Sequence, residues 1–143
     1  MTSSDVWDAG TAARYDRESA FMFAPDVLDP AVDVLAELAG EGPALELAIG
    51  TGRVAIPLAA RGVPVTGIEL SAPMADELRR KTADIPVHVG DMATTTVPGT
   101  FSLVYVVWNS LGNVRTQAGQ VATFANAARH LAPGGHFVVE LTV

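Results

Sequence analysis

Two glycines, Gly50 and Gly52, separate a short apolar run from a segment of helical composition, and acidic residues lie on both sides of them. Glycines allow a ligand to approach the backbone closely, and the first N–H groups of a helix face whatever polar group lies there. Glu46 is a carboxylate inside the apolar run, which is unfavourable unless it finds hydrogen-bond donors. This pattern predicts a site for a nucleotide-like cofactor, although a plain turn would use the same glycines.

The elements that position these residues alternate between strands and helices. Residues 44–49 are long enough for a strand but too short for a helix, and residues 53–61 have helical length and composition. Further strands are predicted at residues 63–70, 85–89, 101–108 and 136–143, and further helices at residues 71–81 and 116–131. Such alternation implies a parallel, right-handed, doubly wound α/β sheet, in which ligands bind at the carboxyl ends of the strands.

The burial of individual elements follows from their residue patterns. Asp29 and Pro30 are predicted to begin a helix, as its N-cap and first residue, that ends at Gly40 or Gly42. The most apolar strand, 101–108, is the best candidate for the middle of the sheet, and the proline-started strand 85–89 for an edge. The helix 116–131 carries a predicted buried stripe of Val121, Phe124, Ala125, Ala128 and Leu131.

The composition fits one α/β domain. A chain of 143 residues can bury about two-thirds of its unfolded surface. The mean hydropathy of +0.29 is high, and the continuous apolar strands of a parallel sheet explain it without a membrane. The uncharged stretch 92–114 contains glycines, threonines and a proline, so it is not a spanning helix. The N-terminus does not resemble a signal peptide and there are no cysteines, so we expect a cytoplasmic protein.

The charge pattern argues against a nucleic-acid partner, and the placement of the histidines argues against a metal site. The net charge is −7, the only lysine is Lys81, and the eight arginines form no basic stripe that could follow a phosphate backbone. His88, His130 and His136 do not form a metal-ligand cluster and are expected to be structural or exposed. We therefore expect no nucleic-acid partner and no metal site.

Several motifs together resemble the class I S-adenosylmethionine-dependent methyltransferases. They are Glu46-x-Ala48-x-Gly50-x-Gly52, Glu69, Gly90-Asp91-Met92 and His130-Leu-Ala-Pro-Gly-Gly135, in the family's order and at its usual spacing. Ala48 stands where the family motif has its first glycine. The resemblance implies a Rossmann-like core at residues 30–143, with five strands in the order 3-2-1-4-5 and helices on both faces, truncated after the fifth strand. Residues 1–29 would form an N-terminal helical lid.

The resemblance also implies a set of residues that bind S-adenosylmethionine, with S-adenosylhomocysteine as the product. The set comprises Tyr15, Glu46, Ala48, Gly50, Gly52, Glu69, Leu70, Asp91, Met92, Trp108 and Asn109. In this assignment Glu46 helps to hold the methionine ammonium, Glu69 accepts hydrogen bonds from both ribose hydroxyls, and Asp91 binds the adenine amino group. Simpler interpretations remain open: Glu69 could be a solvated strand end, and Asp91 a turn residue.

The remaining members of the set would surround the adenine ring and the sulfonium. Leu70 and Met92 would sandwich the ring, while Trp108 and Asn109 would lie beneath the sulfonium. Tyr15 resembles an N-terminal tyrosine that closes over the methionine end in some family members. Tyr15, like Trp7, could instead be a packing group.

The implied reaction is methyl transfer to a small molecule whose identity the sequence does not reveal. No residue stands out as a general base, and the segment after the fourth strand lacks the Asn-Pro-Pro-Tyr-like motif of nucleic-acid amino-methylating enzymes. Two alternatives remain: a minimal S-adenosylmethionine-binding module without turnover, and an NAD-binding domain. The spacing of Gly50, Gly52 and Ala55 with Glu69 also suits NAD. Glu46, the Gly-Asp-Met motif and the helix before the first strand argue against NAD.

The last strand suggests an assembly. Residues 137–143 would present an unpaired, largely apolar edge, which invites pairing with another chain. We expect either a homodimer formed through this C-terminal strand edge, with or without exchanged elements, or a fragment of a longer enzyme.

Overall fold

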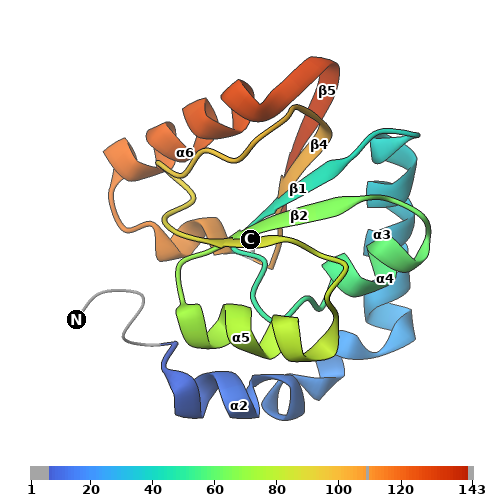
Figure 1. The fold of residues 1–143 in the computed structure, drawn as a ribbon, viewed down its shortest axis with the longest axis vertical. Coiled ribbons are helices and arrows are strands. Elements are labelled where there is room, and N and C mark those ends of the chain that lie inside the picture. The colour runs from blue at the N-terminus through green and yellow to red at the C-terminus, as the bar shows by residue number, and fades with distance from the viewer. Residues whose placement is uncertain (1–6, 109, 142–143) are drawn as a thin grey trace.

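A five-stranded parallel sheet forms the centre of the molecule (Figure 1). The computed structural model describes residues 7–108 and 110–141. Its strands are β1 (Ala44–Leu47), β2 (Val65–Glu69), β3 (Val87–Val89), β4 (Phe101–Val106) and β5 (Leu131–Val139). Its α-helices are α2 (Ala9–Glu18), α3 (Pro25–Ala39), α4 (Ala55–Ala60), α5 (Ala72–Lys81) and α6 (Gln117–His130), and two 3₁₀ helices are η1 (Ala20–Phe23) and η2 (Ser110–Asn113).

The strand order is β3-β2-β1-β4-β5, which confirms the predicted order and the edge position of β3. The central strand is β1: Ala44 pairs with Val65 on one side and with Leu103 on the other. The prediction that strand 101–108 occupies the middle was therefore wrong by one place. All of β1 is buried although it is only four residues long. The apolar sequence of β4 correctly indicates an inner strand, but it does not tell whether β4 or the shorter β1 is the central one.

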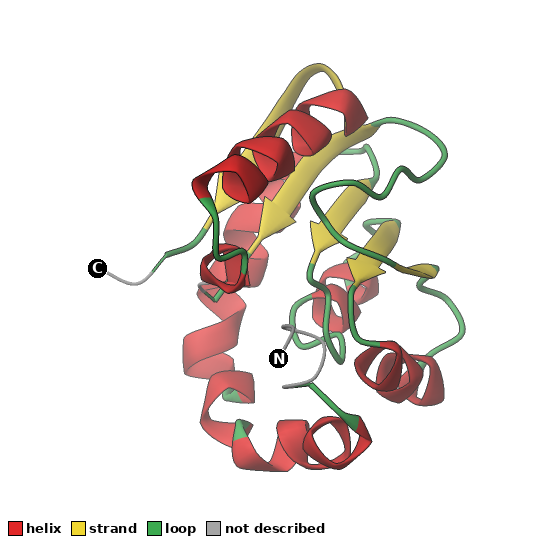
Figure 2. Cartoon of the chain, turned by 90° about the vertical axis from the view of Figure 1, so that its left-hand side faces the viewer, coloured by secondary structure: helices red, strands yellow, loops and turns green. Residues whose placement is uncertain are grey.

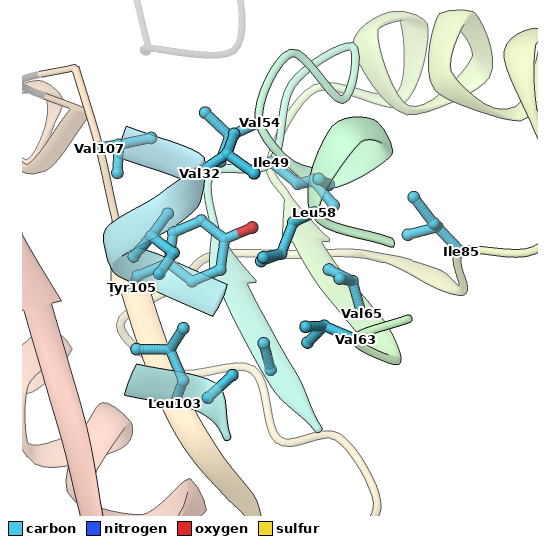
Figure 3. Packing of buried hydrophobic residues seen from close by; sticks show 14 of the residues in the cluster. Val32, Ile49, Val54, Leu58, Val63, Val65, Ile85, Leu103, Tyr105 and Val107 are labelled. Carbon is cyan, nitrogen blue, oxygen red and sulfur yellow. The ribbon is translucent and has the colours of Figure 1, made fainter. Parts of the chain in front are cut away.

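Helices cover both faces of the sheet, as predicted (Figure 1). Against one face pack α3, α4 and α5, whose Val32, Leu58 and Leu78 belong to the same core cluster as Tyr105 of β4. Figure 3 shows Val32 and Leu58 beside Tyr105. The other face is covered by α6 and by the segment after β3, which supply Ala127, Met92 and Val97 to a second cluster. No α-helix among the described residues is both long and apolar enough to cross a membrane.

Helix α3 begins earlier than predicted. It begins at Pro25, and Pro30 lies inside it, whereas Asp29 and Pro30 were expected to start it. A proline inside a helix removes one backbone hydrogen bond. The early start brings Leu28, which is 7% exposed, onto the same buried stripe as Val32. The end at Gly40, with a φ of 60°, agrees with the prediction.

The buried face of α6 is polar, and the predicted apolar stripe was wrong. Val121 and Phe124 are 61% and 48% exposed, while the buried residues are Thr123, Asn126, Ala127 and His130. Asn126 donates to the carbonyls of Met92 and Thr95 at 2.9 and 2.8 Å. His130 Nε2 accepts from the N–H of Val97 at 3.1 Å. The helix faces backbone that needs hydrogen-bond partners, so polar side chains occupy its inner side. His130 is structural, as expected.

The last strand also begins earlier than predicted. It starts at Leu131, directly after α6, rather than at His136. Leu131 pairs with Phe101 and His136 with Leu103, with an irregular register between these pairs. The Pro133-Gly134-Gly135 segment therefore lies within the strand as a local irregularity, and the helix ends before it.

Candidate functional site

Two adjoining cavities lie at the carboxyl ends of the central strands. Figure 2 shows the strands running toward the end of the molecule where α2 lies. The main cavity, of about 340 Å³, is lined by Trp7, Tyr15, Ala48, Gly50, Ile68, Glu69, Leu70, Met74, Gly90, Asp91, Met92, Ser110, Asn113, Val114 and Arg115. The small cavity, of about 50 Å³, is lined by Tyr15, Glu46, Ala48, Ile49, Gly50, Thr51, Arg53, Val54, Val107, Trp108 and Ser110.

The turn after β1 brings the chain around the floor of both cavities. Ala48 and Gly50 line both of them, with φ angles of 56° and 60°. Gly52 lines neither. Its φ is 87°, and an added Cβ would lie 2.4 Å from Leu78 Cδ1, so this glycine allows the turn to pack closely on α5. The two glycines therefore have different purposes: access to the cavity at Gly50 and packing at Gly52.

Glu69, the last residue of β2, is held in the wall of the main cavity by two backbone groups. The N–H of Gly50 donates to Oε1 and the N–H of Ser71 donates to Oε2, both at 2.8 Å. Burial raises the pKa of this carboxyl, and these backbone donors partly oppose that rise. Glu69 is only 7% exposed, so it is not a solvated strand end. A carboxylate fixed in this way keeps acceptor positions for a ligand.

The residues that follow β2 and β3 complete this wall. Leu70, Asp91 and Met92, which the resemblance assigned to the adenine ring, all line the main cavity. Asp91 Oδ1 accepts from the N–H of Ala93 at 2.8 Å, so Asp91 is also a turn residue. Asp91 is thus a turn residue that also lines the cavity. The wall combines acidic acceptors with apolar side chains, which suits a flat ring that carries donor groups.

Glu46 lies in the wall of the small cavity and is 3% exposed. Its Oε1 accepts a hydrogen bond of 2.7 Å from the hydroxyl of Tyr105. Burial raises the pKa of Glu46 to about 8, while the bond from Tyr105 and the charge of Arg53 oppose this rise. A carboxyl in this state would be stabilised as a carboxylate by a cationic group entering the cavity.

Tyr15 of α2 lines both cavities, and its ring meets that of Trp7 edge-on at 5.6 Å between centroids. Burial raises the pKa of the Tyr15 hydroxyl. Each of the two residues is therefore a packing group and a cavity residue at once. The sequence indicated both aromatic residues but did not assign Trp7 to the site.

Trp108, just after β4, lines the small cavity and is 48% exposed. Its φ of 54° is unusual for a bulky residue, and its backbone N–H donates to Glu140 Oε1 at 2.7 Å. The Arg53 guanidinium lies 5.5 Å from the centre of its ring. Asn109, the other residue expected here, lies outside the described residues.

The loop after β4 supplies residues that sequence reasoning missed. Ser110, Asn113, Val114 and Arg115 line the main cavity. The sequence located this segment after the fourth strand but gave no signal for which of its side chains turn inward. Of the predicted set that the structure describes, only Gly52 lies outside both cavities. No group of three potential metal ligands occurs among the described residues.

Comparison with known proteins finds a family and several relatives. A family model described as a methyltransferase domain matches residues 44–135. A dTDP-3-amino-3,6-dideoxy-alpha-D-glucopyranose N,N-dimethyltransferase from Streptomyces fradiae is 38% identical over 67% of this chain and 38% of its own length.

Solved structures extend the likeness to three dimensions. The CcbJ methyltransferase from Streptomyces caelestis has a TM-score of 0.72 and 39% identity, over 76% of this chain and 46% of that one. The amino pentose methyltransferase CalS10 from Micromonospora echinaspora, solved with S-adenosylmethionine bound, has a TM-score of 0.77 and 27% identity, over 89% and 56%. The chain thus spans 38% to 56% of the length of these three proteins.

Proposed function

Since this chain belongs to the class I S-adenosylmethionine-dependent methyltransferases, we propose that it binds this cofactor in the main and small cavities and directs its methyl group to an amine nitrogen of a small molecule. The family's cofactor is S-adenosylmethionine, and CalS10 is solved with it bound. The acceptor class is suggested by relatives whose names describe N-methylation of amino sugars. The observation that carries the proposal is Glu69, which two backbone N–H groups fix in the cavity wall.

The hydrogen-bond acceptors and apolar side chains of the main cavity fit the nucleoside part of the cofactor. Glu69 would accept from the ribose hydroxyls, because its oxygens retain lone pairs beyond the two backbone bonds. Asp91 would accept from the adenine amino group, and Leu70 and Met92 would contact the faces of the ring. These two side chains are 40% and 8% exposed, so Leu70 has more apolar surface left for a ligand to cover.

The small cavity fits the charged end of the cofactor. Glu46 would pair with the methionine ammonium, and Ala48 and Gly50 would let that end approach the backbone. Tyr15 and Trp108 would flank the transfer site and limit its contact with water. When bound, the cofactor supplies a methyl group that its sulfonium activates for displacement.

The chain's own contribution to the reaction is then binding and orientation. Alignment of a nucleophile with an activated methyl group accounts for a large part of such catalysis. A neutral amine needs no proton removed before it attacks, so the proposal requires no general base. We therefore assign no catalytic residue and treat the side chains of both cavities as binding groups.

We also propose that two copies of the chain pair through β5. Within the described residues β5 pairs with β4 alone, so its other edge is available for a partner strand. Beside it, Phe124 of α6 is 48% exposed and meets the ring of Phe137 at 5.1 Å between centroids. A second copy would cover this apolar surface. Sedimentation at micromolar concentration should give a dimer, and Phe124→Lys should shift it to monomer; a monomeric parent contradicts the proposal.

Calorimetric titration with S-adenosylhomocysteine tests the cofactor site. The parent should bind saturably, Glu69→Ala should bind at least about tenfold more weakly, and NADH should not bind. Glu37→Ala, which changes an exposed carboxylate on α3, is the matched control and should bind like the parent. Thermal unfolding of each variant checks that it is folded. Binding of NADH, or equal binding by the parent and Glu69→Ala, contradicts the proposed site.

Release of S-adenosylhomocysteine in the presence of amino-sugar nucleotides tests turnover. Transfer to an amine should produce product only when S-adenosylmethionine and an acceptor are both present. Binding without release across a panel of amino, hydroxyl and carboxyl acceptors would instead favour the binding module without turnover.

A further inference from the structure

Asp16 of α2 joins two parts of the molecule that are far from it in sequence. Its Oδ1 accepts a hydrogen bond of 2.5 Å from the hydroxyl of Thr51. Its Oδ2 forms an ion pair with Nζ of Lys81, the last residue of α5. Thr51 stands between Gly50 and Gly52 in the turn after β1 and is 1% exposed. The N-terminal helix is thus fastened both to the glycine turn and to α5.

A third contact closes the group. Lys81 Nζ donates to the backbone carbonyl of Thr51 at 2.9 Å and also lies 5.5 Å from the centre of the Phe23 ring. Asp16, Thr51 and Lys81, which we call the Asp16 cluster, therefore each contact the other two. An exposed ion pair alone contributes little, but hydrogen bonds to charged groups are stronger, and in this cluster one of them ends on fixed backbone.

The Asp16 cluster lies next to the residues that form the proposed cofactor site. Tyr15 precedes Asp16 and lines both cavities. Gly50 precedes Thr51 and donates to Glu69. The two contacts of Asp16 hold α2 in place, and the contacts of Thr51 with Asp16 and Lys81 hold the turn that carries Gly50.

Two further hydrogen bonds fasten the same N-terminal segment at its ends. Ser71 Oγ donates to the carbonyl of Trp7 at 2.5 Å, and Arg53 Nη1 donates to the carbonyl of Met22 at 3.1 Å. Between these ends α2 packs against α5 (Figure 1). The Asp16 cluster is the central attachment and is built from side chains that carry opposite charges. Its strength should therefore depend on ionic strength.

We propose that the Asp16 cluster is a latch that positions Tyr15 over the cavities and sets the rate at which the cofactor leaves. Trp7 and Tyr15 line the main cavity from the N-terminal segment, so a ligand enclosed by them leaves faster when α2 separates from α5. Separation requires the contacts of Asp16 to Thr51 and Lys81 to break together. The kinetic part of this inference rests on the proposed function, whereas the attachment of α2 does not.

Stopped-flow measurement of S-adenosylhomocysteine dissociation tests the kinetic part. Lys81→Gln and Asp16→Asn should each raise the dissociation rate about five- to tenfold, as expected for loss of a charge-assisted contact. The double variant should show less than the product of the two effects. High salt should speed dissociation from the parent but not from Lys81→Gln. Multiplicative effects in the double variant, or unchanged rates in both single variants, would overturn the latch.

Arg14→Gln is the matched control. Arg14 lies on the same helix and pairs with Glu18 of that helix, and among the described residues it forms no ion pair or hydrogen bond with the turn or α5. Its dissociation rate should stay within about twofold of the parent, as expected for an exposed pair. An equal acceleration in Arg14→Gln and Lys81→Gln would mean that general weakening of α2, rather than the Asp16 cluster, controls release, and would overturn the proposal.

Hydrogen exchange without ligand separates the latch from the proposed function. In Lys81→Gln, residues 9–18 and the turn at 50–52 should exchange faster than in the parent, while α6 should exchange unchanged. Faster exchange throughout the chain, or no change in residues 9–18, would overturn the latch. If the parent fails to bind S-adenosylhomocysteine but these exchange differences appear, the proposed function fails and the attachment of α2 by the cluster stands.

Discussion

The hydroxyl of Tyr105 on β4 donates a 2.7 Å hydrogen bond to Glu46, which lies opposite it on the neighbouring strand β1. Both groups are buried. Burial, and after it the charge of Glu46, raises the pKa of Tyr105 well above its usual value, and burial raises the pKa of Glu46 to about 8. The hydrogen bond from Tyr105 favours the Glu46 carboxylate but does not outweigh burial. The site therefore holds a neutral carboxyl at neutral pH that a cation would ionise.

Cofactor binding should release a proton from Glu46. At about pH 6.5 the free protein carries Glu46 protonated, because its pKa is about 8. Pairing with the methionine ammonium would favour the carboxylate, so binding should release close to one proton. Calorimetry in buffers with different ionisation enthalpies measures this number directly. Glu46→Gln should bind more weakly and release none, and a parent whose binding enthalpy is the same in all buffers would contradict the role of Glu46.

The raised pKa of Glu46 should also lower the stability of the free protein at high pH. The folded carboxyl has a pKa of about 8 against an ordinary value of 4.5, so between these values the folded state holds more protons than the unfolded one. The free energy of unfolding of the protein must then fall as the pH rises through this range. Glu46→Gln removes the effect and should exceed the parent by a few kcal/mol near pH 9, with the difference vanishing toward pH 4.5.

Denaturant unfolding at about pH 5, 7 and 9 measures this difference. Glu37→Gln, at an exposed carboxyl on α3, is the control and should follow the parent at every pH. A Glu46→Gln variant that differs from the parent by the same amount at all three pH values would exclude ionisation of Glu46 as the cause.

The sequence predicted correctly those features that depend on a few neighbouring residues, such as turns, helix caps and buried strands. The alternation of strands and helices predicted the parallel sheet. Of the residues expected around one crevice, Gly50, Glu69 and Asp91 line the main cavity, whereas Gly52 does not. Ser71 caps α5 by accepting from the N–H of Met74, again as its type and position indicate. In each case the signal lies within a few residues of the feature that it predicts.

The sequence failed where a distant partner decides which face is buried. Asn126 and His130 are buried because the backbone around Met92 and Val97 needs partners, and no local pattern in residues 116–131 reveals that need. Likewise, the cavity residues Trp7 and Arg115 lie in segments whose position depends on tertiary contacts. A hydrophobic stripe on a helix predicts which face is buried only when the surface that it packs against is apolar.

Ala48 marks a place where this chain departs from its family motif, and the structure indicates the cost. Its φ of 56° lies in the left-handed region, which disfavours a residue with a Cβ. Ala48→Gly should therefore stabilise the protein by about 0.5–1 kcal/mol, since relief of strain outweighs the added freedom of the unfolded chain. Ala125→Gly, at an exposed position inside α6, should destabilise by a similar amount. Denaturant midpoints measure both, and equal destabilisation by the two substitutions would contradict the strain at Ala48.

Substitution at Gly52 tests how closely the turn after β1 packs on its neighbours, separately from the backbone conformation of that glycine. A Cβ at Gly52 would lie 2.4 Å from Leu78 Cδ1 and 3.1 Å from Ile56, with a φ of 87°. Gly99 has a similar φ of 94°, but an added Cβ there meets nothing within 4 Å. Both glycine-to-alanine changes impose left-handed strain, of about 1–2 kcal/mol. Only Gly52→Ala adds overpacking, which contributes about 1–3 kcal/mol more.

The difference between these two variants therefore isolates the contact between the turn and α5. Gly52→Ala should unfold at a clearly lower denaturant concentration than Gly99→Ala, and it should also weaken S-adenosylhomocysteine binding, because the displaced turn carries the Gly50 N–H away from Glu69. Gly99→Ala should bind like the parent. Equal stability of the two variants would show that Leu78 and Ile56 move aside at little cost, and that the turn tolerates a side chain at this position.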